Sequence, residues 1–275
     1  MKDFRNKVAA ITGAGSGMGR ALAVELAARG CAVAIADIGV AALNETQSLL
    51  QSASVEVSSH VVDVADRAAM EQFAADVVRI HGKVNLVFNN AGVSVTNSVE
   101  KLSYDDFEWL MNINFWGVVH GTKAFLPYLR QVDEAHIINT SSIFGVVAFP
   151  SQSAYNASKF AVRGFTEALR QELADTHIGV SCVQPGGVKT NIVKTSRYYA
   201  VDNEAPTKDE LTKTFEELAA LTPRDAAMQI LRGVEGNRGR VLVGRDATLL
   251  AWVQRLFPES YARRLGVFTK MLQRS

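Results

Sequence analysis

A glycine-rich turn stands between an apolar run and a helical pattern near the start of the chain, and few folds accommodate that order. The apolar run 8–11 leads into TGAGSGMG, and the helical pattern 21–28, which ends at Gly30, follows. Glycine adopts backbone angles that other residues avoid, lets a pyrophosphate approach the backbone closely, and leaves a helix N-terminus open to an anion. We therefore expect a strand, a turn and a helix that together bind a dinucleotide.

The spacing of the glycines indicates which dinucleotide-binding motif is present. It does not fit G-x-G-x-x-G, but it fits T-G-x-x-x-G-x-G. An ordinary glycine-rich loop is the alternative. The residues of this turn that we expect to contact the cofactor are Gly13, Ser16, Gly17, Met18 and Gly19.

An acidic residue at the end of the next apolar run indicates which dinucleotide binds. Asp37 follows the run 31–36 and lies twenty residues after Gly17, where a dinucleotide fold places an acid against the ribose hydroxyls. A carboxylate repels a 2′-phosphate, and neither Ser16 nor Ile38 supplies a positive charge to offset that repulsion. We therefore expect NAD rather than NADP, with an exposed turn aspartate as the alternative.

The rest of the chain alternates strand-like runs with amphipathic helical segments, which predicts a parallel sheet covered on both faces. The 275 residues fit one doubly wound, Rossmann-type α/β domain over 1–275, with ligands at the carboxyl ends of the strands. A hydrophobic content of 48% and a net charge of +1 suit a soluble protein with no overall attraction to nucleic acid. The strand-like runs begin at Val8, Cys31, Val55, Val84, His136, Gly179 and Val241.

Tyr155 and Lys159 stand four residues apart in YNASK, so a helix would point both side chains along one face. A free phenol has a pKa of about 10 and is a poor base at neutral pH. A neighbouring ammonium favours the phenolate and so lowers that pKa. Chance spacing of an exposed tyrosine and a solvated lysine is the alternative, but the glycine turn and Asp37 favour a catalytic pair.

With these segments in place, the chain resembles the short-chain dehydrogenase/reductase family from about Val8 to Thr190, with the family's motifs in the family's order. The resemblance implies an enzyme that moves a hydride between NAD(H) and an alcohol or ketone. Ser142 lies thirteen residues before Tyr155, the family's spacing for the serine that binds the substrate oxygen, and Ser141 is the adjacent alternative. The catalytic residues implied are Asn114, Ser142, Tyr155 and Lys159.

The resemblance also implies further cofactor contacts. Asp63 and Val64 follow the third strand-like run and resemble the family's adenine contact, although a turn aspartate fits equally well. The segments NNAG (89–92) and PGGVKT (185–190) each follow an apolar run and resemble family segments that pass beside the cofactor. The additional cofactor-binding residues expected are Asp63, Val64, Asn90, Ala91, Gly92, Tyr155, Lys159, Pro185, Gly186, Val188 and Thr190. Asn114 lies in an expected helix over 104–129, where without the family we would interpret it as a buried polar residue at a kink.

Two stretches depart from the core pattern. The segment 191–222, with an expected helix over 208–221, lies where the family builds a substrate lid; a surface loop or a dimer contact are the alternatives. We expect the segment 245–275 to form a C-terminal helical extension, whereas many bacterial family members end in a short glycine-rich tail that stabilises a tetramer. Residues 240–275 carry seven Lys or Arg against two acids, which gives +5. Their apolar side chains could pack on the domain, cap the substrate site or touch a membrane; these are Leu249, Leu250, Trp252, Val253, Leu256, Phe257, Leu265, Val267, Phe268 and Leu272.

The substrate is indicated only by apolar residues near the expected site. We expect Val93, Ser142, Phe144 and Tyr198 to bind it, and no basic cluster suggests a phosphorylated or acyl-carrier substrate. A hydrophobic or aromatic secondary alcohol or ketone is the prediction. The alternatives are a sugar or polyol dehydrogenase and a non-catalytic NAD-binding regulator on the same fold.

Cysteine, histidine and the N-terminus bear on compartment and partners. Two cysteines in apolar runs suggest no disulfide scaffold, and five scattered histidines suggest no metal site. The chain enters its first strand directly, and no apolar run reaches the roughly 18 residues of a membrane span. We therefore expect a cytoplasmic protein without metal, nucleic-acid or membrane partners. From the resemblance we expect a homodimer, formed through the helices that hold Asn114 and Tyr155, or a homotetramer.

Overall fold

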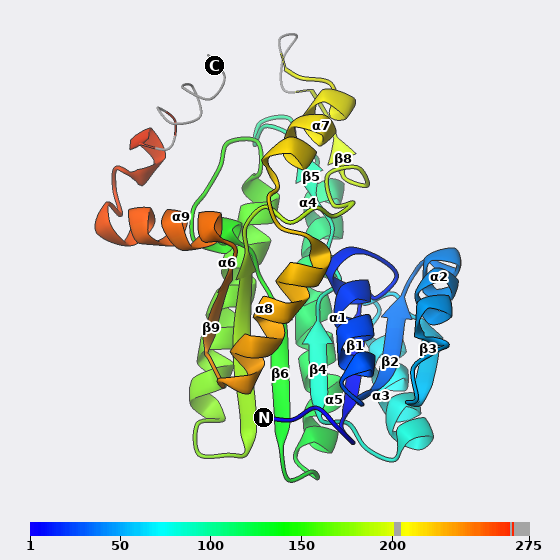
Figure 1. The fold of residues 1–275 in the computed structure, drawn as a ribbon. Helices are drawn as coiled ribbons and strands as arrows, with labels where there is room; N and C mark the ends of the chain where they lie inside the picture. Colours follow the sequence, from blue (N-terminus) through cyan, green and yellow to red (C-terminus); the bar gives the residue numbers. More distant parts are fainter. Residues whose placement is uncertain (201–204, 265, 267–275) are drawn as a thin grey trace.

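The structure is a computed structural model, and it describes residues 1–200, 205–264 and 266. Within these residues a seven-stranded sheet, in the order β3-β2-β1-β4-β6-β7-β9, forms the centre of the molecule (Figure 1). Every neighbouring pair is parallel, which confirms the predicted doubly wound sheet. The strands are β1 Val8–Thr12, β2 Ala32–Asp37, β3 Val57–Val61, β4 Leu86–Asn89, β6 Ala135–Thr140, β7 Ile178–Pro185 and β9 Arg240–Val243.

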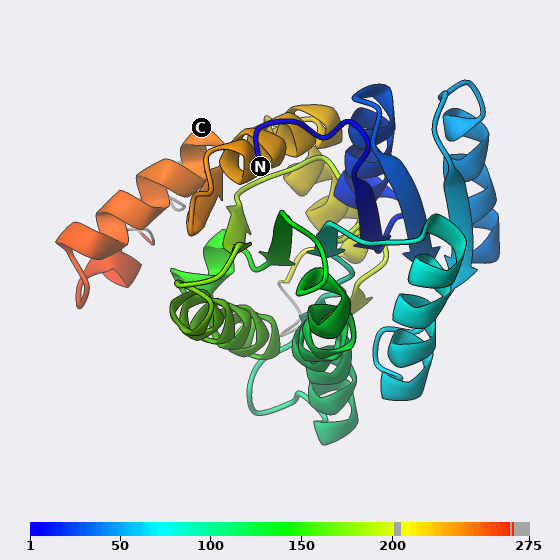
Figure 2. The ribbon, with the colours of Figure 1, turned by 90° about the horizontal axis from the view of Figure 1, so that it is seen from below.

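Helices cover both faces of this sheet, as the view from below shows (Figure 2). One apolar core packs α1, α2 and α8 against one face, and a second packs α3, α5 and α6 against the other. The helices on the first face are α1 Gly17–Ala28, α2 Val40–Leu50 and α8 Pro223–Glu235; those on the second are α3 Arg67–His81, α5 Gly117–Leu129 and α6 Ser153–Glu172.

Covering both faces explains why the strands are apolar runs rather than alternating patterns. Along β1, Ala9 and Ile11 enter the first core, while Val8 and Ala10 enter the second. Because successive side chains of a strand point to opposite faces, a strand buried on both sides needs apolar residues at every position. The central strands are therefore visible in the sequence as continuous hydrophobic segments.

The helix expected over 104–129 contains an interruption. It consists of α4 Tyr104–Met111, a π-helical turn η1 Asn112–Trp116, and α5. A π turn accommodates one extra residue, and such turns are frequent at functional sites. Asn114 lies inside it and is fully buried. The expectation of a buried polar residue at an irregular point of the helix is thus met in this turn.

The described parts of the 191–222 segment, residues 191–200 and 205–222, lie above the sheet (Figure 1). They hold β8 Arg197–Tyr198, which pairs in parallel with β5 Val95–Thr96, and α7 Lys208–Leu218. The expected helix 208–221 therefore ends three residues early. The reason is that the backbone becomes extended at Ala219, and the Leu221 carbonyl instead accepts a hydrogen bond from the Lys189 N–H at 2.9 Å.

After β9 the chain forms the helix α9 Arg245–Leu256. This helix packs on the short 3₁₀ turn η2 Ile143–Gly145, which follows β6. Ala247 and Ala251 form the buried side of α9. The predicted packing of this helix on the domain is therefore found for one face only, because Leu249, Trp252 and Leu256 are 59%, 55% and 63% exposed. Four apolar residues of the predicted extension lie outside the described residues, as do residues 201–204. These four are Leu265, Val267, Phe268 and Leu272.

Neither a membrane span nor a metal cluster is found in the described part of the chain. No helix there is both long enough and apolar enough to cross a bilayer. No group of three or more His, Cys, Asp or Glu side chains within it is arranged to hold a metal ion. Both cysteines, Cys31 and Cys182, are buried free thiols.

Candidate active site

The residues singled out by sequence converge on one edge of the sheet, its upper edge in Figure 1. Parallel strands bring their carboxyl ends to the same edge, where open α/β sheets bind ligands. Here β1 leads into the glycine turn, β2 ends at Asp37, and β4 leads into the 89–92 segment. Next to them, β6 ends two residues before Ser142 and β7 ends at Pro185.

The glycine turn packs tightly on the 89–92 segment. Thr12 Oγ1 accepts hydrogen bonds from the N–H groups of Asn90 (3.0 Å) and Ala91 (3.1 Å). Gly13 has a φ of +66°, and a Cβ there would lie 2.8 Å from the Ala91 Cα. Glycine is therefore required at this position both by the backbone conformation and by the close approach of the two segments.

Asp37 is fixed at the end of β2 by backbone donors. Its Oδ2 accepts the Gly15 N–H at 2.9 Å, and its Oδ1 accepts the Gly39 N–H at 3.0 Å. A Cβ at Gly15 would lie 2.8 Å from Oδ2, so no side chain separates the carboxylate from the turn. The predicted ribose acid thus stands directly against the glycine turn.

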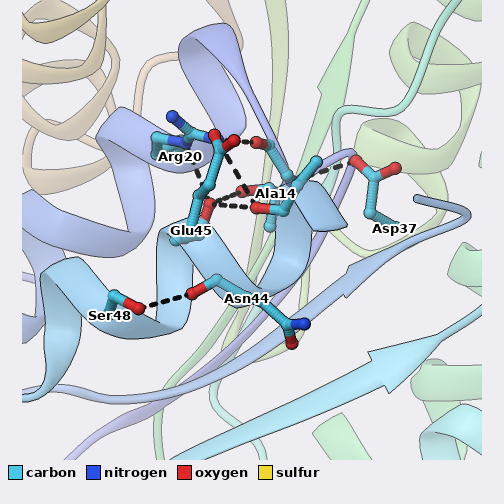
Figure 3. A network of polar contacts seen from close by, with 9 residues as sticks. Ala14, Arg20, Asp37, Asn44, Glu45 and Ser48 are labelled. Carbon is cyan, nitrogen blue, oxygen red and sulfur yellow. Dashed lines mark hydrogen bonds and ion pairs between the residues drawn. The ribbon is translucent and has the colours of Figure 1, made fainter. Parts of the chain in front are cut away.

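A polar network clamps the outer side of the same turn, and the sequence pattern did not indicate it (Figure 3). Arg20 donates to the Gly15 carbonyl, to Glu45 Oε2 at 2.7 Å and to Thr46 Oγ1 at 2.9 Å. The Thr46 hydroxyl in turn donates to the Ala14 carbonyl at 2.9 Å. The only sequence signal was the position of Arg20 directly after the glycines, which says nothing of its partners on α2.

The other predicted cofactor residues near α1 and β3 lie at the same edge. Ser16 precedes α1 with extended backbone, and among the described residues its side chain makes no capping bond, so the helix N-terminus is open. Met18 is partly buried against the first core. Asp63 is exposed, and its Oδ1 accepts the Ala65 N–H at 2.9 Å, as in the turn alternative. Val64 is buried, so only its backbone remains available to a ligand.

The 185–190 segment closes over the glycine turn. Gly186 N–H bonds the Val243 carbonyl at 2.9 Å. The Val188 side chain is buried in the first core, which leaves only its backbone to face the site. Thr190 lies beside Gly17, where a Cβ would stand 3.1 Å from its Cγ2. The segment therefore spans from the end of β7 to the N-terminus of α1.

The predicted catalytic residues also come together. Lys159 is 2% exposed; its Nζ donates to the Thr140 carbonyl at 3.0 Å and lies 5.5 Å from the Tyr155 ring centroid. Asn114 Oδ1 accepts the Val93 N–H at 2.8 Å. A Cβ at Gly92 would lie 3.3 Å from that oxygen and 3.4 Å from Lys159 Nζ, so the 89–92 segment borders both side chains.

Burial shifts both members of the Tyr155 and Lys159 pair toward their neutral forms. It raises the pKa of the Tyr155 phenol to about 12, although a hydrogen bond with Ser142 opposes the shift. It lowers the pKa of the Lys159 ammonium to about 8. The expected lowering of the tyrosine pKa is therefore not found in this geometry. The physical reason is burial of the phenol itself. In addition, Lys159 Nζ donates to the Thr140 carbonyl rather than to the phenol.

The two adjacent serines differ in their partners. Ser141 is buried and donates to the Lys159 carbonyl at 2.7 Å, which is a bond within the fold. Ser142 Oγ accepts the Phe144 N–H at 3.1 Å and is the serine that bonds Tyr155. The geometry therefore favours Ser142 over Ser141 as the site serine.

Of the four expected substrate contacts, Ser142, Phe144 and Val93 border Tyr155, and Tyr198 does not. The Phe144 ring meets the Tyr155 ring edge-on, with centroids 5.9 Å apart, and stacks on Phe149 at 4.5 Å. Val93 packs in the same apolar cluster as Tyr155. The Tyr198 hydroxyl instead donates to the Pro206 carbonyl, which ties this side chain to the 191–222 segment itself.

An ion pair that the sequence did not indicate anchors the 191–222 segment. Arg197 Nη1 lies 2.7 Å from Asp106 Oδ1 on α4, and its guanidinium stands 3.7 Å from the Trp109 ring centroid. Burial would raise the pKa of the Asp106 carboxyl, but hydrogen bonds with Arg197, Tyr199 and Ser103 hold it below its ordinary value. The carboxylate therefore stays charged and keeps Arg197 in place.

Known proteins of one family match this chain over most of its length. The sequence profile of the short chain dehydrogenase family matches residues 7–199. The protein SadH of Mycobacterium tuberculosis, named as an oxidoreductase, is 43% identical over 270 residues, covering 96% of this chain and 95% of SadH. The CLA biosynthesis dehydrogenase/reductase of Lactiplantibacillus plantarum is 34% identical, covering 75% of this chain and 73% of that protein.

A solved structure agrees over nearly the whole chain. The short-chain dehydrogenase/reductase of Burkholderia phymatum, crystallised in complex with NAD, matches with a TM-score of 0.85 and 34% identity. The match covers 94% of this chain and 96% of that one. The protein is therefore an oxidoreductase that belongs to the short-chain dehydrogenase/reductase family.

Proposed function

We propose that this protein transfers a hydride reversibly between NAD(H) and a hydrophobic or aromatic secondary alcohol or ketone. The observation that carries the proposal is the buried Lys159 ammonium 5.5 Å from the ring of Tyr155, beside a serine that bonds the phenol. This arrangement couples a proton-transfer group to a charge that can stabilise its ionised form.

The residues at the strand ends fit NAD. Asp37 presents a fixed carboxylate for ribose hydroxyls, and neither Ser16 nor Ile38 offers a positive charge to a 2′-phosphate. The N-terminus of α1 is open to a pyrophosphate. Asn90 Oδ1 is buried beside the turn and receives no hydrogen bond from the described residues, so it has capacity for a ligand donor. The NAD complex of the Burkholderia relative supports the same cofactor.

In the mechanism we propose, each catalytic side chain handles a proton or a charge. Bound NAD supplies the carbon that accepts the hydride. Tyr155 takes the proton of the substrate hydroxyl, and Ser142 hydrogen-bonds the reacting oxygen. Lys159 stabilises the phenolate and holds the cofactor ribose, and Asn114 orders a water that carries the proton out past Lys159.

The choice of substrate class rests on the apolar surroundings of Tyr155. Phe144, Phe149 and Val93 line the phenol side of the site. Such a wall binds an apolar or aromatic group and provides few partners for the hydroxyls of a sugar. We propose that 191–222 acts as the lid over this wall, within one catalytic domain. A sugar or polyol dehydrogenase is the enzymatic alternative.

Spectrophotometric assay of nicotinamide reduction tests the proposal. Purified protein is mixed with NAD or NADP and a panel of aliphatic, aromatic, steroid and polyol alcohols. We expect turnover with NAD and an apolar alcohol, and a loss of more than about a hundredfold in Tyr155→Phe with NADH binding retained. Turnover of polyols alone would contradict the substrate class, and a fully active Tyr155→Phe would contradict the mechanism.

Assembly and compartment complete the proposal. Trp116 on η1 and Phe160 on α6 are 47% and 41% exposed, and large exposed aromatic side chains on these helices suit a homodimer interface. A homotetramer built on that dimer is the larger alternative. The two free thiols suit a reducing cytoplasm. Light scattering at micromolar concentration tests the dimer, and a monomer there would contradict it.

A further inference from the structure

A carboxylate from the C-terminal helix holds the turn that follows β7. Asp246 Oδ2, in the first turn of α9, accepts the Gly187 N–H at 2.6 Å. A Cβ at Gly186 would collide with the same carboxyl group, so the turn and the carboxylate are in close contact. A backbone N–H bonded to a carboxylate is a charge-assisted hydrogen bond, about twice as strong as a neutral one.

The chain geometry after β9 brings Asp246 back to this turn. Gly244 stands between β9 and α9 with a φ of +101°, which favours glycine. The helix then runs outward from the upper end of β9 (Figure 1). As a result, one side of the turn is held by the main chain of β9, through Gly186 N–H and the Val243 carbonyl, and the other by Asp246.

The position of this turn sets the course of the segment that closes over the cofactor site. Three residues after Gly187, Thr190 reaches Gly17 at the start of α1. At its other end, β7 pairs with β6, which leads directly to Ser142. The Gly186–Gly187 turn therefore lies on the Ser142 side of the site, away from Asp37 at the end of β2.

The same helix also supports the loop that carries Ser142. Ala247 and Ala251 pack in one apolar cluster with Ile143 and Val147. Farther along, the Tyr261 hydroxyl accepts the Ala148 N–H at 3.1 Å. The C-terminal extension therefore contacts both loops that flank the proposed reaction centre.

We propose that Asp246 is a positioning residue that holds the Gly186–Gly187 turn for the nicotinamide half of NAD, so that the C-terminal helix is part of the cofactor site. The proposal rests on the proposed function, because it assumes that NAD lies across the strand ends with its nicotinamide near Ser142. The adenosine half, at Asp37 and the glycine turn, is independent of Asp246.

Binding of a whole and a truncated cofactor tests this division. NADH and ADP-ribose, which lacks the nicotinamide, are titrated into wild type, Asp246→Ala and Asp246→Asn. We expect Asp246→Ala to weaken NADH about tenfold, through loss of one charge-assisted hydrogen bond and the resulting freedom of the turn, and to leave ADP-ribose unchanged. Asp246→Asn keeps an oxygen acceptor and should recover about half of that loss on a logarithmic scale.

The matched control is Thr248→Ala. Thr248 also lies in the first turn of α9, where its hydroxyl bonds the Gly244 carbonyl at 3.1 Å, but it does not bond the 186–187 turn. This variant should leave both ligands unchanged, which separates a weakened helix start from a displaced turn. A thermal melt of each variant records any effect on folding.

The other outcomes separate a failure of the Asp246 role from a failure of the proposed function. Unchanged NADH binding in Asp246→Ala, or an equal loss for NADH and ADP-ribose, would overturn the positioning role while leaving the proposed function intact. Failure of wild type to bind either ligand would overturn the proposed function first. If Asp246→Ala does not fold, Asp246→Asn carries the test, and NADH binding equal to wild type would then overturn the inference.

Discussion

Replacing Lys159 with methionine removes a buried positive charge beside Tyr155 and leaves an unbranched side chain of similar length. Lys159 Nζ is 5.5 Å from the Tyr155 ring centroid. At an effective dielectric constant of about 20, two unit charges at this separation attract by about 3 kcal/mol. Since about 1.4 kcal/mol corresponds to a factor of ten, the ammonium offsets the cost of a buried phenolate by about a hundredfold, although burial keeps the pKa of Tyr155 above its ordinary value.

The expected result at neutral pH is a turnover number about a hundredfold lower in Lys159→Met, with its activity profile displaced toward higher pH. The sign of the pH effect follows from the lysine. Its ammonium is present below the pKa of about 8 and is lost above it. The ratio of wild-type to variant activity should therefore be largest below that pH and shrink above it.

The assay is the initial rate of NADH formation across neutral and alkaline pH, with an alcohol that wild type oxidises. NAD must be saturating, because loss of the Lys159 ammonium also weakens cofactor binding. Lys123→Met makes the same chemical change at an exposed position of α5 and should behave as wild type. Equal turnover of wild type and Lys159→Met at saturating NAD, with superimposable pH profiles, would refute the electrostatic reasoning.

Two further substitutions test the cofactor and lid assignments. Asp37→Ala removes an acceptor for ribose hydroxyls and the hydrogen bonds to Gly15 and Gly39. NAD should therefore bind about tenfold more weakly, whereas the affinity for NADP should not fall. Isothermal titration measures both affinities. An unchanged preference for NAD would contradict this. Asp106→Asn weakens the 2.7 Å ion pair with Arg197. A protease should then cut the 191–222 segment severalfold faster. The KM for substrate should rise severalfold while kcat stays nearly constant. Wild type should show the same change as pH falls through the lowered pKa of Asp106, because the carboxylate is present above that pKa and lost below it. Cleavage equal to that of wild type would exclude an anchoring role.

The sheet and the order of the site residues could be predicted from the sequence because they depend on local patterns. A strand buried on both faces must be apolar throughout, as β1 is, and the glycines mark a turn whose backbone angles other residues avoid. The carboxyl ends of parallel strands then bring Asp37, the 89–92 segment and Ser142 to one edge without further information.

What could not be predicted depends on long-range partners. Arg20 clamps the glycine turn through Glu45 and Thr46, which lie more than twenty residues away on another helix. Arg197 finds Asp106 across 91 positions. The pKa of Tyr155 depends on how deeply the group is buried and on where Lys159 points, and spacing in a helix fixes neither.

The π turn at Asn112–Trp116 gives one continuous helix two angular settings. One added residue rotates everything after it by about 100° relative to a regular helix. Before α5, Asn114 bonds the Val93 backbone. Within α5, Gly117 and Gly121 present bare backbone to Val64 and Asn89, where a Cβ would collide. Deleting one residue of this turn would make the helix regular, but it would rotate Gly117 and Gly121 away from the residues that they contact. The wider π turn thus lets the helix pack against the sheet and place Asn114 against Val93 at the same time.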